Sequence, residues 1–180
     1  MTATAKGRVL IGADEIDRTI ARLAHEIVEP SDAQNGLLLI GIRRGGEALA
    51  IRIAAKIGAI LGREPALGFL NINLYRDDDV SHALPESQIP VDVAGRTVVL
   101  VDDVLFTGRT IRSALDALTD FGRPAAIRLC CLVDRGSREL PIQPDYVGRE
   151  IPSAHTERVE VRLGAEASAS DEVTIRADAP

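Results

Sequence analysis

The chain has 180 residues, of which 46% are hydrophobic and 27% are charged, and its formal net charge at pH 7 is −6. This length fits a single domain, residues 1–180, with a substantial core, and the acidic balance argues against a protein that binds polyanions with its whole surface. No apolar run reaches the ~18 residues of a membrane span, and the N-terminus lacks the apolar core of a signal peptide, so we expect a cytoplasmic protein without a membrane segment.

The first predicted elements are a short strand, Val9–Ile11, and a helix that begins near Asp14 and ends before Pro30. Apolar residues recur at helical spacing along this helix, at Ile16, Ile20, Leu23 and Ile27. The opposite stripe carries Arg18, Arg22 and His25. On composition alone, this stripe is best interpreted as a solvated face with ion pairs one turn apart.

A continuous apolar run, Leu37–Ile42, predicts a buried parallel strand. It is followed by Arg43, Arg44, Gly45 and Gly46 and then by a predicted helix, Glu47–Leu61. Amide donors at a helix start, together with two guanidinium groups, suit a pyrophosphate. A Gly-Gly turn between a strand and a helix is common, so this loop is weak evidence by itself.

The next predicted strand is Phe69–Tyr75, and a long polar segment, residues 76–93, follows it. A loop of this length inside a compact domain is usually functional. We predict a mobile lid that closes over a reacting centre and excludes water. The alternative is a surface hairpin with no catalytic part.

The most informative stretch is VVLVDDVLFTGRT, Val98–Thr110. Four apolar residues, Val98–Val101, predict a strand that ends at the carboxylates Asp102 and Asp103. The loop from Thr107 to Thr110 then leads into a helix, where free N–H groups and hydroxyls bind a phosphate. Carboxylates suit sugar hydroxyls, or a hard cation through its waters. Phosphoribosyl pyrophosphate (PRPP) carries all these groups.

Beyond this stretch the sequence predicts a helix, Ile111–Phe121, a strand, Ala126–Val133, and a C-terminal hairpin, residues 158–176. Cys130 and Cys131 are adjacent on the strand, so we expect them to face opposite sides as core residues. Apolar runs that alternate with helical patterns predict an α/β fold, a mainly parallel twisted sheet flanked by helices. Its loops then meet at the carboxyl edge of the sheet.

The stretch Val98–Thr110 resembles the PRPP-binding signature of type I phosphoribosyltransferases. Together with LYRDD (residues 74–78), VDRGSRELPI (residues 133–142), PDYVG (residues 144–148) and IPS (residues 151–153), it resembles the PyrR family, which combines a pyrimidine operon regulator with a uracil phosphoribosyltransferase. The resemblance covers nearly the whole chain. It implies the type I phosphoribosyltransferase fold and the conversion of uracil and PRPP to UMP and pyrophosphate.

The resemblance also implies roles for residues. Asp102 and Asp103 would hold the ribose hydroxyls, with Mg²⁺ bound nearby mainly through PRPP and water. Arg43–Gly46 would hold the pyrophosphate on a strained or cis Arg43–Arg44 peptide, and residues 134–152 would form a hood over the uracil. Tyr75, Arg76 and Asp77 would belong to the lid. The remaining substrate contacts would come from Val104, Leu105, Phe106, Thr107, Gly108, Arg109, Thr110, Asp134, Arg135 and Arg138.

Phe106 bears on the choice of base. Purine-salvage relatives carry an acidic side chain just before the TG of the phosphate loop, placed to handle the N7 proton of a purine. Phe106 cannot do this, whereas an aromatic face can pack on a pyrimidine. The sequence therefore favours uracil over hypoxanthine or guanine, and a purine phosphoribosyltransferase stays open as an alternative.

The second activity implied by the resemblance is UMP-dependent binding to the leader of pyrimidine-operon mRNA. Our candidates for phosphate contacts are Arg18, Arg22, His25 and Arg149. Two positions depart from the family: Arg44-Gly45-Gly46 replaces Thr-Arg-Gly, and Ser137 replaces a histidine. A regulator that uses the pocket only as a nucleotide sensor is thus a second hypothesis. The family also suggests a homo-oligomer, a dimer or a tetramer.

Overall fold

The computed structural model describes residues 7–30, 36–73 and 86–177. Its centre is a parallel sheet of five strands in the order β3-β2-β4-β5-β6. The strands are β2 (Leu37–Ile42), β3 (Ala66–Leu70), β4 (Thr97–Leu105), β5 (Ala126–Asp134) and β6 (Tyr146–Glu150). The predicted α/β class and the mainly parallel sheet are confirmed.

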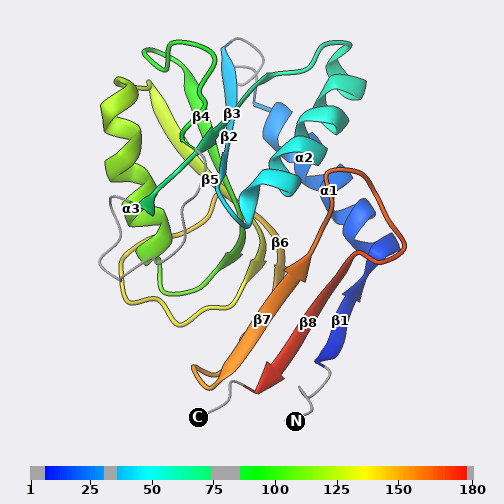
Figure 1. Ribbon diagram of the computed structural model, residues 1–180. Helices are drawn as coiled ribbons and strands as arrows, with labels where there is room; N and C mark the ends of the chain where they lie inside the picture. Colours follow the sequence, from blue (N-terminus) through cyan, green and yellow to red (C-terminus); the bar gives the residue numbers. More distant parts are fainter. Residues whose placement is uncertain (1–6, 31–35, 74–85, 178–180) are drawn as a thin grey trace.

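Helices cover both faces of this sheet (Figure 1). The helices α1 (Ala13–Val28) and α2 (Gly46–Leu61) lie on one face, and α3 (Arg109–Leu118), followed by the 3₁₀ turn η3 (Thr119–Phe121), lies on the other. Alternate strand residues therefore feed two cores. Cys130 belongs to the core under α1 and α2, and Cys131 to the core under α3, as predicted from their adjacency.

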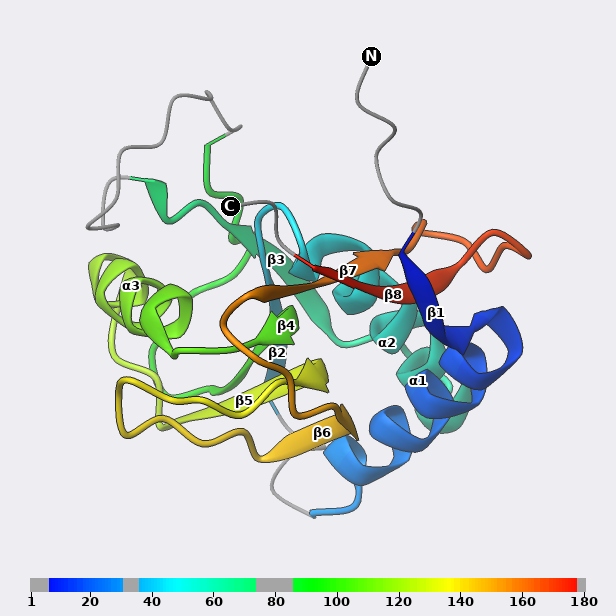
Figure 2. The ribbon, with the colours of Figure 1, turned by 90° about the horizontal axis from the view of Figure 1, so that it is seen from below.

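A second sheet is antiparallel and has the order β1-β8-β7. Its strands are β1 (Arg8–Gly12), β7 (Glu157–Arg162) and β8 (Glu172–Ala177). Seen from below, it lies across the end of the parallel sheet (Figure 2). The C-terminal hairpin was predicted, but the pairing of β1 with β8 was not, because a short N-terminal strand carries no signal for a distant partner.

Two predicted strands have other bounds in the structure, and one strand was not predicted. The strand expected at 69–75 is β3, Ala66–Leu70, because its ladder with β2 ends at the Ile42–Leu70 pair and the Asn71 N–H donates to the Ser87 hydroxyl instead. β4 continues past Val101 to Leu105, since β5 extends beside it. β6 was missed inside the segment interpreted as hood.

No helix in the described part of the chain is both long enough and apolar enough to cross a membrane.

Candidate functional site

The candidate site lies at the carboxyl edge of the parallel sheet, where the loops after β2, β4 and β5 meet. Parallel strands point the same way, so the loops that follow them gather at one edge. The loop Arg43–Gly46 follows β2, the loop Phe106–Gly108 follows β4, and the segment 135–142 follows β5. The sheet thus brings together the predicted pyrophosphate loop, the predicted phosphate loop and the acid pair.

The two glycines of the first loop allow it to touch β4. A Cβ at Gly45 would lie 2.1 Å from Oδ1 of Asp103, and a Cβ at Gly46 would lie 1.9 Å from the carbonyl oxygen of Val101. Neither distance is possible for a side-chain carbon, so only glycine fits at these positions without a shift of the backbone or of the acid pair. The loop predicted to hold pyrophosphate is therefore in close contact with the carboxylates of β4.

The two arginines of this loop differ. The side chain of Arg43 is largely buried: it donates to Glu47 at 2.5 Å and to Gln88 at 3.3 Å, and its guanidinium lies 5.5 Å from the centre of the Phe69 ring. Arg44 is exposed and has a φ of +86°, a left-handed conformation that is strained for a residue with a Cβ. The Arg43–Arg44 peptide is trans, so the strain expected here lies in φ.

The acid pair lies within β4 and not after it. Asp102 is buried, and its carboxylate accepts the Asp103 N–H at 3.1 Å. The carboxylate of Asp103 accepts the Val104 N–H at 2.8 Å. Burial raises the pKa of Asp103 above its usual value, although the hydrogen bond from the Val104 N–H opposes the rise. A bound hydroxyl or a hydrated cation would relieve this desolvation.

The predicted phosphate loop, Thr107–Thr110, leads into the first turn of α3. Gly108 is the N-cap of α3 and has a φ of +92°. The Arg109 N–H lies 3.4 Å from the Thr107 hydroxyl, and the Arg109 side chain pairs with Glu139 at 2.6 Å. Free N–H groups at the start of a helix point out of its first turn, where a phosphate would bind.

The segment after β5 is folded onto this loop. The N–H groups of Glu139 and Leu140 donate to the carbonyl of Thr107 at 2.9 and 3.2 Å. Arg138 donates to the Phe106 carbonyl at 2.9 Å and to the Asp134 carboxylate at 2.6 Å. Burial by itself opposes the ionisation of Asp134, but hydrogen bonds from Arg138 and the Gly136 N–H outweigh it and lower the pKa of this carboxyl. Arg138 thus fixes the segment to the phosphate loop.

Arg135 is buried beneath Phe106. Its guanidinium carbon lies 3.8 Å from the centre of the Phe106 ring, and the ring of His155 lies 4.9 Å from the same centre at an angle of 52°. Nothing in the sequence singled out His155, because a histidine in a loop has no partner that spacing alone reveals.

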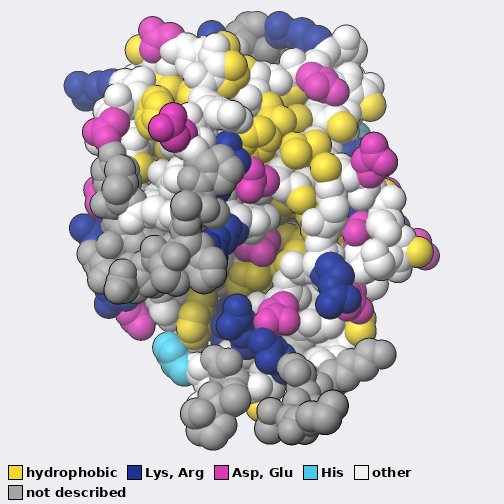
Figure 3. All heavy atoms as spheres, viewed as in Figure 1, with side chains coloured by type: hydrophobic (Ala, Val, Ile, Leu, Met, Phe, Trp, Pro, Cys, Tyr) yellow, Lys and Arg dark blue, Asp and Glu magenta, His cyan; other side chains and the backbone are white. Residues whose placement is uncertain are grey.

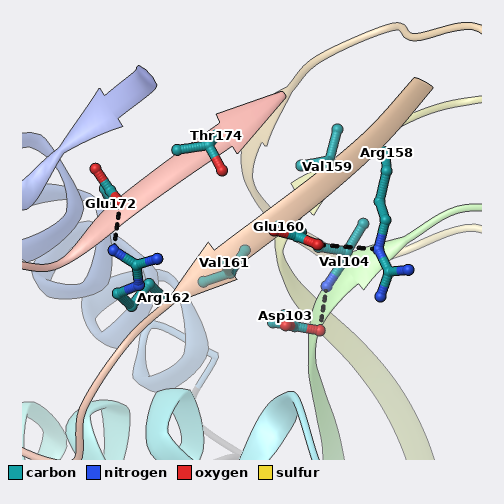
Figure 4. Close-up of a pocket in the computed structure, with 9 residues that line it drawn as sticks. All are labelled: Asp103, Val104, Arg158, Val159, Glu160, Val161, Arg162, Glu172 and Thr174. Carbon is teal, nitrogen blue, oxygen red and sulfur yellow. Dashed lines mark hydrogen bonds and ion pairs between the residues drawn. The ribbon is translucent and has the colours of Figure 1, made fainter. Parts of the chain in front are cut away.

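A pocket of about 400 Å³ opens between the acid pair and the β7–β8 hairpin (Figure 4). Asp103 and Val104 form its floor, and charged residues of the hairpin line it, among them Arg158, Glu160 and Arg162. The alternation of β7 indicated one solvated face. It did not indicate that part of this face borders the acid pair, which depends on where the second sheet lies. Basic and acidic side chains are interspersed over β7 and β8 (Figure 3).

The four candidate RNA contacts gather on the α1–β6 face. Arg22 donates to the carbonyls of Val147 and Gly148 at 3.1 and 2.6 Å and pairs with Glu26. Arg149 of β6 pairs with Glu15 of α1. Arg18 and His25 are exposed on the same helix. The chain therefore brings these residues together, and Arg22–Glu26 is an ion pair of the kind expected one turn apart on this helix.

Tyr75, Arg76 and Asp77 lie outside the described residues, as does most of the predicted lid, residues 76–93. Among the residues that are described, no group of three or more His, Cys, Asp or Glu side chains could hold a metal ion. Asp102 and Asp103 are two adjacent carboxylates of β4.

The sequence of this chain is similar to those of known phosphoribosyltransferases. The model of the phosphoribosyl transferase domain matches residues 12–165. The Bifunctional protein PyrR of Roseiflexus sp. (strain RS-1) is 53% identical over 161 residues, 86% of each chain, and that of Chloroflexus aurantiacus is 50% identical over 170 residues, 92% of this chain and 93% of the relative.

Solved structures share the fold. A hypoxanthine-guanine phosphoribosyltransferase from Bacillus anthracis has a TM-score of 0.69 at 19% identity and covers 95% of this chain and 99% of its own. A hypoxanthine phosphoribosyltransferase from Trypanosoma cruzi, solved with the product IMP, has a TM-score of 0.66 at 21% identity, with 86% and 80% covered. At these identities the similarity concerns the fold alone.

Proposed function

This chain belongs to the PyrR family of phosphoribosyltransferases, and on that premise we propose that it transfers phosphoribose from PRPP to uracil and regulates a pyrimidine operon through its mRNA. In the transfer, N1 of uracil forms a bond to C1′ of the ribose and loses its proton. The bond from C1′ to the pyrophosphate oxygen breaks, so the products are UMP and pyrophosphate. The observation that supports this best is the contact between the pyrophosphate loop and the acid pair at Gly45.

In this proposal each loop binds one part of PRPP. Thr107–Thr110 bind the 5′-phosphate, with Val104 and Leu105 beneath the sugar, Asp102 and Asp103 bind the ribose hydroxyls, and the Arg43–Gly46 loop binds the pyrophosphate. Tyr75, Arg76 and Asp77 act from the lid. Magnesium, when bound with PRPP, would neutralise charge on the departing pyrophosphate; the two carboxylates suit its water shell. Catalysis then rests on positioning and charge stabilisation.

Uracil is the proposed base because Phe106 stands where a purine enzyme needs an acid. Asp134, Arg135 and Arg138 shape the base subsite, and the two guanidinium groups act through the backbone segments that they hold. The test is UMP formation from uracil, PRPP and Mg²⁺, with guanine as the competing substrate. A preference for guanine, or no turnover with either base, would overturn this part of the proposal.

The RNA half of the proposal rests on the α1–β6 face, and it requires a cytoplasmic protein. Arg18, Arg22, His25 and Arg149 would contact phosphates of the operon leader, and UMP in the pocket would strengthen the complex. We expect a salt-sensitive complex that weakens in the Arg18→Ala/Arg22→Ala variant. Arg123→Ala is the matched control, because it removes an exposed arginine on another part of the surface. If the operon leader RNA does not bind at modest salt, the regulatory half of the proposal is wrong and only the uracil phosphoribosyltransferase remains.

The proposed assembly is a homo-oligomer, a dimer or a tetramer, because a regulator that contacts a folded RNA gains affinity from repeated basic faces. Light scattering coupled to size-exclusion chromatography would measure the mass. A monomer of 19.3 kDa at micromolar concentration would contradict this assembly.

A further inference from the structure

Arg135, Phe106 and His155 form a stack beside the start of the predicted phosphate loop. Phe106 directly precedes Thr107, the first residue of the loop that is proposed to hold the 5′-phosphate. One face of the Phe106 ring is covered by the Arg135 guanidinium at 3.8 Å. That face is therefore closed to a nucleobase.

Arg135 also fixes the segment that carries His155. It donates to the Ser153 hydroxyl at 2.7 Å and to the carbonyls of Ala154 and Glu157 at 2.9 and 2.6 Å. These partners flank His155 on both sides in the chain. These three charge-assisted hydrogen bonds from a buried arginine fix the turn, and they thereby hold the imidazole of His155 against Phe106.

The same turn leads into the pocket at the acid pair. β7 begins at Glu157, two residues after His155, and runs along the pocket whose floor is Asp103 and Val104 (Figure 4). His155 itself is exposed, whereas Phe106 is half-buried. Of the two rings, the imidazole thus has more surface left for a flat ligand.

We propose that His155 is a specificity-determining residue of the nucleobase subsite, where its ring and the open part of Phe106 contact a planar pyrimidine, and that Arg135 is the positioning residue that holds both rings. The inference rests on the proposed function. It adds that the aromatic contact with the base is shared by a loop residue after β6. A contact of this kind is worth about 0.5–1.5 kcal/mol, up to roughly tenfold in affinity.

The kinetic test compares His155→Ala with Thr156→Ala, which truncates the exposed neighbour. We expect His155→Ala to raise KM for uracil by about five- to tenfold, with KM for PRPP changed by less than about twofold. His155→Phe should restore most of the loss because it keeps a flat ring, and Thr156→Ala should resemble the wild type. Equal changes in both KM values, or no change in KM for uracil, would overturn the proposal.

Arg135→Lys tests the positioning role. Lysine keeps the charge but loses the planar fork that stacks on Phe106 and holds the turn. We expect Arg135→Lys to raise KM for uracil as much as His155→Ala does. The double variant Arg135→Lys/His155→Ala should raise this KM little further, because both changes remove the same contact. A fully additive double variant would contradict the assignment of Arg135 to this role.

A binding measurement separates this inference from the proposed function. Calorimetric titration with UMP and with ribose 5-phosphate needs no turnover. His155→Ala should weaken the binding of UMP by about five- to tenfold and leave that of ribose 5-phosphate unchanged. If the wild type made no UMP from uracil, this difference would still test His155. Equal binding of UMP by the wild type and His155→Ala would overturn the inference even in an active enzyme.

Discussion

Two clusters of carboxylates in this molecule have opposite electrostatic surroundings. In the site, burial raises the pKa of Asp103, and among the described residues no cation forms an ion pair with it. In the second cluster, Arg52 of α2 pairs with Asp171 at 2.6 Å and with Asp17 of α1 at 3.2 Å, and Lys56 pairs with Asp17 at 3.1 Å. The second cluster joins both helices to the turn between β7 and β8.

The pKa shifts in the two clusters have opposite directions. The hydrogen bond from Lys56 lowers the pKa of Asp17. Burial opposes the ionisation of Asp171, but the Ser168 N–H and Arg52 outweigh it, so its pKa is also lowered. The carboxylates that pair with cations join the helices α1 and α2 to the turn between β7 and β8. No cation of the described segments pairs with the desolvated carboxylate of Asp103, which is typical of a group that meets its partner in a ligand.

The largest effect is expected from Arg52→Met, which leaves Asp171 buried and without its cation. Removal of one partner of a buried ion pair destabilises a protein by about 3–5 kcal/mol. Urea denaturation would measure the free energy of unfolding. Lys56→Met is the control, since its pair with Asp17 is half-exposed and should contribute at most about 1 kcal/mol. Similar losses in the two variants would show that the buried pair is not the anchor of the turn.

Asp103→Asn should separate activity from stability. The variant loses the charged acceptor for a ribose hydroxyl or for the water shell of a cation, so UMP formation should fall by about 10²-fold. The free energy of unfolding should stay equal or rise, because a desolvated charge is removed. A variant that forms UMP as fast as the wild type, or that is less stable than the wild type, would show that Asp103 is a structural carboxylate like Asp171.

Gly45→Ala tests the contact between the pyrophosphate loop and the acid pair. Its Cβ would lie 2.1 Å from the carboxylate of Asp103, which must turn away. We expect kcat/KM for PRPP to fall by about tenfold, a loss of roughly 1.4 kcal/mol in transition-state stabilisation. Gly12→Ala is the control, because a Cβ there meets nothing within 4 Å. Unchanged kinetics in Gly45→Ala would remove the main support for a single compact site.

These two clusters also show how far the sequence leads. Asp102 and Asp103 could be predicted because strand, acid pair, glycine loop and helix follow one another within one short segment. The Arg52–Asp171 pair could not be predicted, since its partners are far apart in the sequence and meet only when the second sheet docks on the helices. The pairing of β1 with β8 and the place of His155 were hidden for the same reason. Sequence periodicity predicts secondary structure, whereas the position of the second sheet depends on contacts between residues that are far apart in the chain.

The smallest effect expected is on the pH dependence of stability. The pKa values of Asp17 and Asp171 are lowered in the folded protein, so their contribution is present above the unfolded value of 3.8 and is lost as the pH falls through the folded values. Asp103 has the opposite sign: its folded pKa is raised, so the folded state takes up this proton first and gains stability as the pH falls from neutral towards 3.8.

Urea denaturation between pH 7 and pH 3 would therefore distinguish the two clusters by comparison of variants, in which the other carboxylates cancel. In Asp103→Asn, the free energy of unfolding should no longer rise as the pH falls from neutral to mildly acidic values. It should still fall at lower pH. Asp171→Asn should do the reverse and flatten the fall below about pH 4, because the paired carboxylate that must be protonated is gone. If both variants changed the stability in the same pH range, the division between a ligand-binding and a fold-holding carboxylate cluster would be wrong. A loss of activity in Asp103→Asn would then have to be explained by altered packing at β4.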